Sequence, residues 1–264
     1  MEKNSLTIPM AIIVAGVLIG GAVILSNRGN SVASTTDKVV KKDPIEININ
    51  PIDLSDHIMG SPDAKALLVE YSDTECPYCK NFHKTLNTVA DQYGKDGKFA
   101  WVYRHFPLDV LHKKARKEAE ATECAAELGG NAKFWEYINK LYDTTPSNDR
   151  LDPSELPKIA VAVGLDKTSF ETCLNSGKYA NEVDKDYQEA TKIGGRGTPY
   201  SIFVLKSAPS KELKDFIDFN NAEISKAQGG GEDMMGISKD GRKIFVSGAM
   251  PYEMMKSIVD LILK

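Results

Sequence analysis

The sequence contains few cysteines, no large excess of charge of either sign and only one long apolar run. Four cysteines among 264 residues are too few to stabilise a fold mainly through disulfides, so a hydrophobic core must supply most of the stability. The net charge of −4 is small and spread along the chain, which gives no electrostatic reason to expect a nucleic-acid partner. The composition, 42% apolar and 27% charged, is that of a globular chain and excludes a collagen, a coiled coil or a disordered tail.

The apolar run covers residues 8–25 and contains no charged side chain. As a helix it would be roughly 27 Å long, close to the ~30 Å hydrocarbon core of a bilayer. We therefore expect a single transmembrane anchor after a short N-terminal segment, residues 1–7. A cleaved signal peptide is the alternative, favoured by the small residues Ala33 and Ser34 downstream, although its apolar stretch is usually only about 7 to 15 residues long. A buried core helix is the third interpretation.

Residues 26–51 are polar and small without a helical period, which indicates a flexible linker. The folded domain is therefore expected at residues 52–264. Its first part predicts a βαβ unit. Residues 66–71 (ALLVEY) form a continuous apolar run typical of a strand buried on both faces. An amphipathic helix is expected at 77–93 and a second strand at 99–103.

From about residue 110 to 195 the pattern predicts helices and no strand, so we expect a helical insertion there. Strands follow at 200–205 and 243–246, and a helix at 251–263 closes the chain. The residues between these two strands, 206–236, exceed what a hairpin needs and are expected to form a mobile insertion at its tip. The order βαβ, helices, ββα indicates an α/β fold.

The first helix of the insertion carries many charges. Lys114 and Glu118 are spaced i, i+4, as are Arg116 and Glu120. Such spacing is typical of a solvent-exposed helix face. We expect all four side chains to be exposed.

The motif Cys76-Pro77-Tyr78-Cys79 follows the first strand and begins the next helix. Pro77 suits the first helical position, because its missing N–H would be unpaired there. Cys76 is then the N-cap residue, where free backbone N–H groups and the helix dipole favour a thiolate. A thiol at such a position becomes nucleophilic at neutral pH, and Cys79 is the natural resolving thiol.

The alternatives to redox chemistry at this motif are a zinc or copper site and an inert disulfide. Zinc usually requires a second pair of ligands, and the remaining candidates supply no second spacing of that kind: His83, His105, His112, Cys124 and Cys173. His83 could reach Cys79 one turn away, but we expect it to be a partly exposed surface residue. No metal ligand is therefore assigned, and a metal-binding module stays a minor alternative.

Several separated segments resemble one known family. They are VEYSDTECPYC before the helix, the helical block, GGRGTPYSIFV, and VSGAMPYEMMKSIVDLI at the end. In combination they resemble the thioredoxin-fold thiol-disulfide oxidoreductases, specifically the DsbA-like branch and its membrane-anchored members. The motif CPYC alone is less specific, because glutaredoxins also carry it. The resemblance covers most of the chain from about residue 56 onward and implies a thioredoxin fold with a helical insertion.

The resemblance also assigns site residues. The family places a buried acidic group six residues before the first active-site cysteine, where this chain has Glu70; it would relay the proton of Cys79. An exposed strand glutamate is the alternative. Pro199 matches the family's cis-proline, which lies against the cysteines and binds extended substrate. With Pro199, the expected substrate-binding residues are Thr198, Pro77 and Tyr78.

The second cysteine pair, Cys124 and Cys173, lies inside the helical insertion. Free buried cysteines are the expectation for an intracellular protein. Outside the cell two cysteines in one subdomain tend to pair, and anchored DsbA-like proteins often have cysteines at such positions. The resemblance therefore implies a structural disulfide.

Taken with the anchor, the resemblance implies an extracytoplasmic enzyme, single-pass in the cell membrane or secreted after cleavage. It would oxidise cysteine pairs in exported proteins without a cofactor, and a quinone-linked DsbB-like or VKOR-like membrane protein would reoxidise it. A disulfide reductase or isomerase on the same fold is the alternative.

Overall fold

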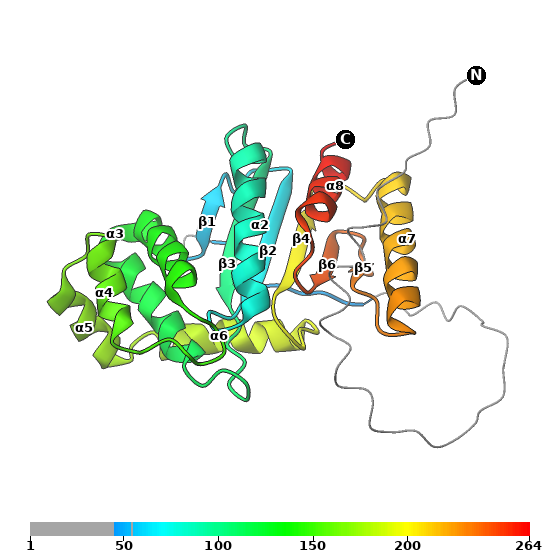
Figure 1. Ribbon diagram of the computed structural model, residues 1–264. Helices are drawn as coiled ribbons and strands as arrows, with labels where there is room; N and C mark the ends of the chain where they lie inside the picture. The colour runs from blue at the N-terminus through cyan, green and yellow to red at the C-terminus, as the bar shows by residue number, and fades with distance from the viewer. Residues whose placement is uncertain (1–44, 54) are drawn as a thin grey trace, which may run out of the picture.

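The computed structural model describes residues 45–53 and 55–264 (Figure 1). The elements follow in this order: β1 (His57–Gly60), β2 (Ala66–Ser72), α2 (Pro77–Tyr93), β3 (Phe99–His105), α3 (Ala115–Thr144), α4 (Glu155–Ala162), α5 (Lys167–Ser176), α6 (Ala180–Lys192), β4 (Tyr200–Leu205), α7 (Lys211–Gln228), β5 (Met235–Ile237), β6 (Lys243–Ser247) and α8 (Tyr252–Leu263).

The strands form one six-stranded sheet in the order β1-β3-β2-β4-β6-β5. Strands β2 and β3 are parallel, and all other neighbours are antiparallel. The parallel pair is connected through α2, which is the βαβ unit that the sequence predicts. Strands β2 and β3 are buried along their whole length, as expected for strands covered on both faces.

Helices cover both faces of the sheet, because alternate residues of each strand point to opposite sides. On one face Leu68 and Trp101 belong to a core shared with α2, α7, α8 and the second half of α3. On the other face Val69 and Val102 pack with α6 and with the segment that includes Ile47. A third core lies within the helical block. In Figure 1 the helical block lies at one edge of the sheet and α7 at the other.

Helices α3 to α6 occupy the region in which the sequence predicts helices without strands. The long helix α3 is broken at Gly130, which has φ 73° and ψ −172°. Only glycine adopts this conformation readily. Before the break Cys124 lies in the core of the helical block. After it the helix contributes to two cores: Tyr137 and Leu141 lie in the core of the block, whereas Trp135 packs against the sheet.

Strands β4 and β6 pair antiparallel, so residues 206–236 are inserted between two hairpin strands as expected, but they pack on the domain instead of forming a loose tip. This segment contains helix α7, whose Leu213 and Ile217 are buried against the main core, and strand β5, which pairs with β6. Strand β1 at the opposite edge was also missed, because its four residues show no clear alternation.

The predicted membrane segment, residues 8–25, lies outside the residues that the structure describes, as does most of the predicted linker. Among the residues that are described, no helix has the length and apolar character needed to cross a bilayer.

Candidate active site

Cys76 and Cys79 lie where strand β2 passes into helix α2, at the lower end of the sheet in Figure 1. Cys76 is the N-cap residue with extended backbone angles, and Pro77 occupies the first helical position. Cys76 is 4% exposed and Cys79 is fully buried. Both are free cysteines. Tyr78 between them is 52% exposed. Only the first thiol therefore lies close to solvent.

The surroundings of Cys76 favour its thiolate. The pKa of Cys76 is lowered to about 6. A hydrogen bond from Cys79 is the largest cause, and together with the Thr198 side chain and the backbone amides of Cys79 and Tyr78 it outweighs burial, which acts the other way. These amides belong to the first turn of α2, where N–H groups have no partner within the helix. At neutral pH most of the Cys76 population is therefore the nucleophilic thiolate.

Cys79 has the opposite character. Burial raises its pKa well above the ordinary value, and the neighbouring Cys76 and Glu70 raise it further. The backbone N–H of Asp73 points at its sulfur at 3.5 Å. A nucleophilic outer thiol and a protonated inner thiol are the two states that thiol-disulfide exchange at a Cys-X-X-Cys motif requires.

The loop before strand β4 lies against Cys76. The Thr198–Pro199 peptide bond is cis, and the Cys76 thiol donates a hydrogen bond to the Thr198 carbonyl at 3.5 Å. The Thr198 hydroxyl is buried without a hydrogen-bond partner among the described residues, and it is placed to donate to the Cys76 thiolate. The Pro199 carbonyl accepts a bond from Gly248 N at 2.8 Å. The structure thus brings together residues 122 positions apart.

Glu70 lies beneath the dithiol and is fully buried on strand β2, so it does not point to solvent. Its Oε1 accepts a hydrogen bond from the Ser72 hydroxyl at 2.8 Å, and its Oε2 accepts one from Trp101 Nε1 at 3.0 Å. Burial raises the pKa of Glu70 to about 8 despite these two bonds. The carboxyl therefore keeps its proton at neutral pH. The Tyr142 hydroxyl, from the insertion, lies 3.1 Å from the Ser72 hydroxyl.

His83 differs from the sequence-based expectation. It is only 2% exposed and packs between the rings of Trp101 and Tyr142. Its Nε2 lies 2.6 Å from Asn139 Oδ1. Burial lowers the pKa of His83 to about 4, so it is a neutral core residue rather than a surface side chain.

Polar residues around the motif were missed or misjudged from the sequence. Glu118 was expected on an exposed face but is 2% exposed, and Glu75 is fully buried directly before Cys76. Asp73 accepts hydrogen bonds from the Leu108 backbone N–H, at 2.7 Å, and interacts with His112 Nδ1 at 2.9 Å. A run of polar residues between a buried strand and the motif was the available signal for Asp73 and Glu75.

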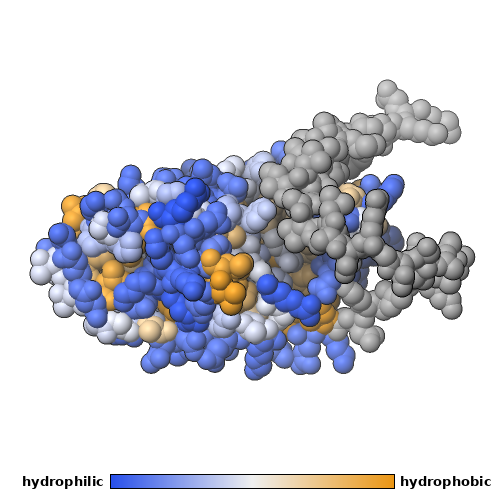
Figure 2. All heavy atoms as spheres, turned by 60° about the horizontal axis from the view of Figure 1, so that its bottom comes forward, coloured by the Kyte–Doolittle hydropathy of each residue, from blue (hydrophilic) through white to orange (hydrophobic). Residues whose placement is uncertain are grey.

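The face that Figure 2 shows, with the bottom of Figure 1 turned forward, is mostly polar with separate apolar patches. Val110 and Leu111, in the loop after β3, are 91% and 66% exposed. No group of three or more His, Cys, Asp or Glu side chains is arranged to hold a metal ion in residues 45–53 and 55–264.

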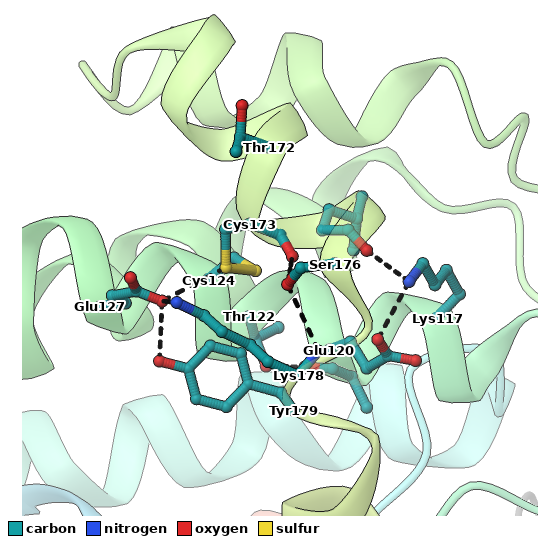
Figure 3. The surroundings of a disulfide bond; sticks show 12 residues. Lys117, Glu120, Thr122, Cys124, Glu127, Thr172, Cys173, Ser176, Lys178 and Tyr179 are labelled. Atoms are coloured by element: carbon teal, nitrogen blue, oxygen red, sulfur yellow. Dashed lines mark hydrogen bonds and ion pairs between the residues drawn. A yellow bond between two sulfur atoms is a disulfide. The ribbon is translucent and has the colours of Figure 1, made fainter.

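Cys124 and Cys173 form a disulfide between α3 and α5, with their Cα atoms 5.8 Å apart (Figure 3). Next to it, Glu127 accepts a hydrogen bond from the Tyr179 hydroxyl at 2.9 Å and pairs with Lys178. Cys124 and Cys173 lie in the core of the insertion, so the disulfide is separate from the Cys76–Cys79 dithiol.

The fold and the dithiol at a helix N-terminus define a protein of the thioredoxin-fold class. A family model described as Thioredoxin matches residues 53–218, and the chain belongs to this family. Similar solved structures include α-DsbA1 of Wolbachia pipientis (TM-score 0.59, 20% identity, covering 81% of this chain and 92% of that one) and DsbA2 of Pseudomonas aeruginosa (0.56, 21%, 80% and 96%). BdbD of Bacillus subtilis is also similar (0.54, 21%, 72% and 100%). The thioredoxin fold that the resemblance implies is confirmed by the family model and by these solved structures.

Curated relatives matched by sequence carry another name. The Na(+)/H(+) antiporter NhaA 1 of Mycolicibacterium gilvum is 32% identical over 191 residues, 71% of this chain. NhaA 3 of Salinispora tropica is 33% identical over 144 residues. The chain spans about 30% of the length of the first of these relatives and 21% of the second.

Proposed function

We propose that this chain is an extracytoplasmic thiol-disulfide oxidoreductase that oxidises cysteine pairs in exported proteins through Cys76 and Cys79. The observation that carries the proposal is the contrast between the two thiols: the pKa of Cys76 is lowered to about 6, while burial raises that of Cys79. A low pKa makes Cys76 a good leaving group, and this favours the reduced enzyme and hence oxidation of the substrate.

In the oxidising direction the Cys76–Cys79 disulfide is attacked at the Cys76 sulfur by a substrate thiolate. The bond between the two enzyme sulfurs breaks, and Cys79 leaves with its electron pair. A second substrate thiolate then attacks the substrate sulfur of the mixed disulfide and displaces Cys76 as a thiolate. The substrate has lost two electrons and gained a disulfide, and the enzyme is reduced.

Glu70 is proposed to supply the proton that Cys79 takes up as it leaves. The carboxyl is neutral at pH 7, because its pKa is raised to about 8, and its ionised form would raise the pKa of Cys79. A general acid with a pKa near the working pH is effective in both directions. In reoxidation the carboxylate would take the proton back.

The loop at Thr198 and Pro199 is proposed to bind an extended segment of the substrate, with Pro77 and Tyr78 on the opposite side. The support is their position: Thr198 contacts the Cys76 thiol, and Tyr78 is more than half exposed beside it. Backbone groups beside a reactive sulfur can pair with an extended peptide, and the Thr198 carbonyl is released for this when Cys76 is a thiolate and no longer donates to it.

An extracytoplasmic location is supported by the Cys124–Cys173 disulfide, because such bonds persist mainly in oxidising compartments. We propose that residues 8–25 anchor the chain in the membrane and that a quinone-linked DsbB-like or VKOR-like protein reoxidises the dithiol. The proposed linker is confined to the part of residues 26–51 that precedes Ile45, because Ile47 is buried in a core of the domain. Amino-terminal sequencing of the mature protein tests the anchor, and a soluble product beginning near Ser34 would overturn it.

The direction of the reaction is tested by the equilibrium potential of the dithiol against glutathione. A value near about −120 mV supports an oxidase, whereas one near about −270 mV would indicate a reductase. The matched control is Cys76→Ser, which must abolish exchange with a dithiol peptide. Zinc or copper that stays bound through purification and is lost in this variant would instead support the metal-binding alternative.

A further inference from the structure

Two carboxyl groups are buried directly behind the dithiol. Glu75 is fully buried and Glu118, in the first turn of α3, is 2% exposed. No lysine, arginine or histidine within the described part of the chain forms an ion pair with either group. Two ionised carboxylates without a cation would be strongly unfavourable in such a place, so the pair must keep a proton.

The hydrogen bonds place this proton. The Thr145 hydroxyl and Leu151 N donate to Glu75 Oε1, at 3.2 and 3.4 Å. The Thr74 hydroxyl donates to Glu118 Oε2 at 2.7 Å. Glu75 Oε2 is buried and accepts from none of the ordinary donors among the described residues. Burial raises the pKa of Glu118 to about 9, and its hydrogen bond with Glu75 raises it too. Glu118 is therefore assigned the proton, and Glu75 Oε2, a buried oxygen that no other described donor reaches, is the acceptor left for it.

Glu75 is held in turn by residues 145–151, which connect α3 to α4 and which we call the 145–151 strap. Asn148 N donates to the Glu75 carbonyl at 2.8 Å. Lys80 and Lys114 donate to backbone carbonyls at the two ends of the strap, at 2.6 and 2.7 Å. The residue before Cys76 is thus bonded to the insertion through both its side chain and its backbone.

The backbone of the strap is unusual. Ser147, Asn148 and Asp149 all have positive φ, at 63°, 58° and 59°. This left-handed region is rarely adopted by residues other than glycine, and a run of three persists only where the surroundings fix it. Asp149 accepts hydrogen bonds from the backbone N–H groups of Lys113 and Lys114, so the strap is also bound to the start of α3, one turn from Glu118.

We propose that Glu118 is a positioning residue of the dithiol site: its carboxylic acid hydrogen bond to Glu75, together with the 145–151 strap, fixes the backbone that carries Cys76. The inference deepens the proposed function and rests on it for its consequence in catalysis. If the bond is lost, the loop before Cys76 loosens, and the N-cap geometry that exposes the Cys76 thiolate to helix N–H groups is lost with it.

The other charged groups around the pair are Asp73, His112, Asp149, Arg150, Lys80 and Lys114. Asp73 pairs with His112, and the remaining four bind backbone groups. None of them donates to either carboxyl, so they do not replace the shared proton.

The shared proton is tested directly by infrared spectroscopy of the whole protein at pH 7. Glu118→Gln should remove one protonated-carboxyl band, because its amide can donate to Glu75 and accept from Thr74 without titrating. The matched control is Glu120→Gln, two residues further along the same helix and paired with Lys117, which should leave the band unchanged. A Glu118→Gln spectrum identical to wild type would overturn the proposal.

The positioning role is tested by titrating the Cys76 thiolate through its ultraviolet absorbance in the reduced protein. In Glu118→Gln the pKa of Cys76 should equal that of wild type. In Glu118→Ala it should be higher by about one unit, so that the thiolate forms at an about tenfold lower proton concentration. An equal pKa of Cys76 in the two variants overturns the positioning role of Glu118. If Glu118→Ala does not fold, Glu75→Gln is measured instead: burial keeps the Glu118 acid protonated, but its acceptor changes from a carboxylate to an amide oxygen. The Glu118 acid band should therefore shift in frequency, and a band at the wild-type position overturns the proposal.

These readouts separate the inference from the proposed function. The infrared bands do not require any exchange activity, and Cys76→Ser leaves the Glu75–Glu118 pair in place. Absent exchange in wild type would refute the enzyme while the shared proton stands, and an active enzyme with no shared proton would refute the role of Glu118 alone.

Discussion

Cys76 and Cys79 are the same residue type one helical turn apart, yet their thiols differ strongly. Cys76 lies at the N-cap and receives hydrogen bonds, whereas Cys79 is fully buried beside Glu70, so burial raises its pKa. The difference comes from position and not from the side chain, since desolvation disfavours a thiolate and N–H donors favour it. The hydrogen bond from Cys79 is the largest contribution at Cys76.

We therefore expect Cys79→Ala to raise the pKa of Cys76 from about 6 toward the free-thiol value of about 8.5. Since the thiolate exists above the pKa, Cys76 would be mostly thiolate at pH 7 in wild type and mostly thiol in the variant. The measurement is the pH dependence of the alkylation rate of the reduced protein. An unchanged titration would mean that the helix and Thr198 suffice without Cys79.

At the scale of elements, periodicity predicts those helices and strands that have a strong apolar pattern. Helix α2 has the predicted bounds, residues 77–93, because its buried side chains recur every three to four positions, once in each turn. Helix α7 has only Leu213 and Ile217 buried, so its pattern is weak, and its contacts with α8 and β5 decide its structure. Strand β5 exists only because β6 pairs with it.

The disulfide between α3 and α5 belongs to this scale. It closes a loop of 49 residues, and the chain-entropy model gives a stabilisation of about 4 kcal/mol for a loop of that length. The double variant Cys124→Ala/Cys173→Ala should lose up to this amount in urea unfolding. Titration of Cys76 should not change, because the disulfide lies in a separate core. Equal unfolding midpoints would contradict the structural role.

At the scale of the whole molecule, a buried His-Glu-His cluster joins the sheet to the insertion. Glu123 of α3 lies 2.8 Å from both His57 Nε2 of β1 and His105 Nε2 of β3. Burial raises the pKa of Glu123, but hydrogen bonds from His105 and His57 outweigh it and lower the pKa to about 2. Burial lowers the pKa of His105, but Glu123 outweighs it and raises the pKa.

Glu123→Gln should therefore destabilise the protein by on the order of 3 kcal/mol, the usual cost of breaking a buried ion pair. Because the pKa of Glu123 is lowered in the folded state, its carboxylate stabilises the folded protein above the unfolded pKa of about 4.5, and this stabilisation is lost as the pH falls toward 2. Because the pKa of His105 is raised in the folded state, its charged form stabilises the folded protein below about pH 6.5, and that contribution is lost as the pH rises through the folded pKa. The difference between wild type and variant in urea unfolding should thus be largest near about pH 5 to 6.

The matched control for this cluster is Glu136→Gln, which removes an exposed pair with Lys133 on the same helix. Such surface pairs contribute less than about 1 kcal/mol. A pH-independent difference, or one no larger than that of the control, would show that the cluster is not an ion pair.

The sequence by itself determined the features that depend on neighbouring residues. The motif at 76–79, the start of its helix at Pro77 and the buried strands on either side follow from spacing and backbone preference, which act over one or two turns. The helical character of the insertion was evident for the same reason. Cys76 and Cys79 were assigned from the motif itself, whereas Glu70, Thr198 and Pro199 were assigned by resemblance; the roles of all five stay proposals.

Only the tertiary structure decided which distant residues meet. Thr198 reaches Cys76 across 122 positions, and Glu118 is buried against Glu75 although its i, i+4 spacing to Lys114 is typical of an exposed face. A helical period reports only which side chains share a face; whether that face meets water or another chain segment depends on packing. Whether the Glu118 carboxyl is an exposed anion or a buried acid therefore depends on the tertiary structure.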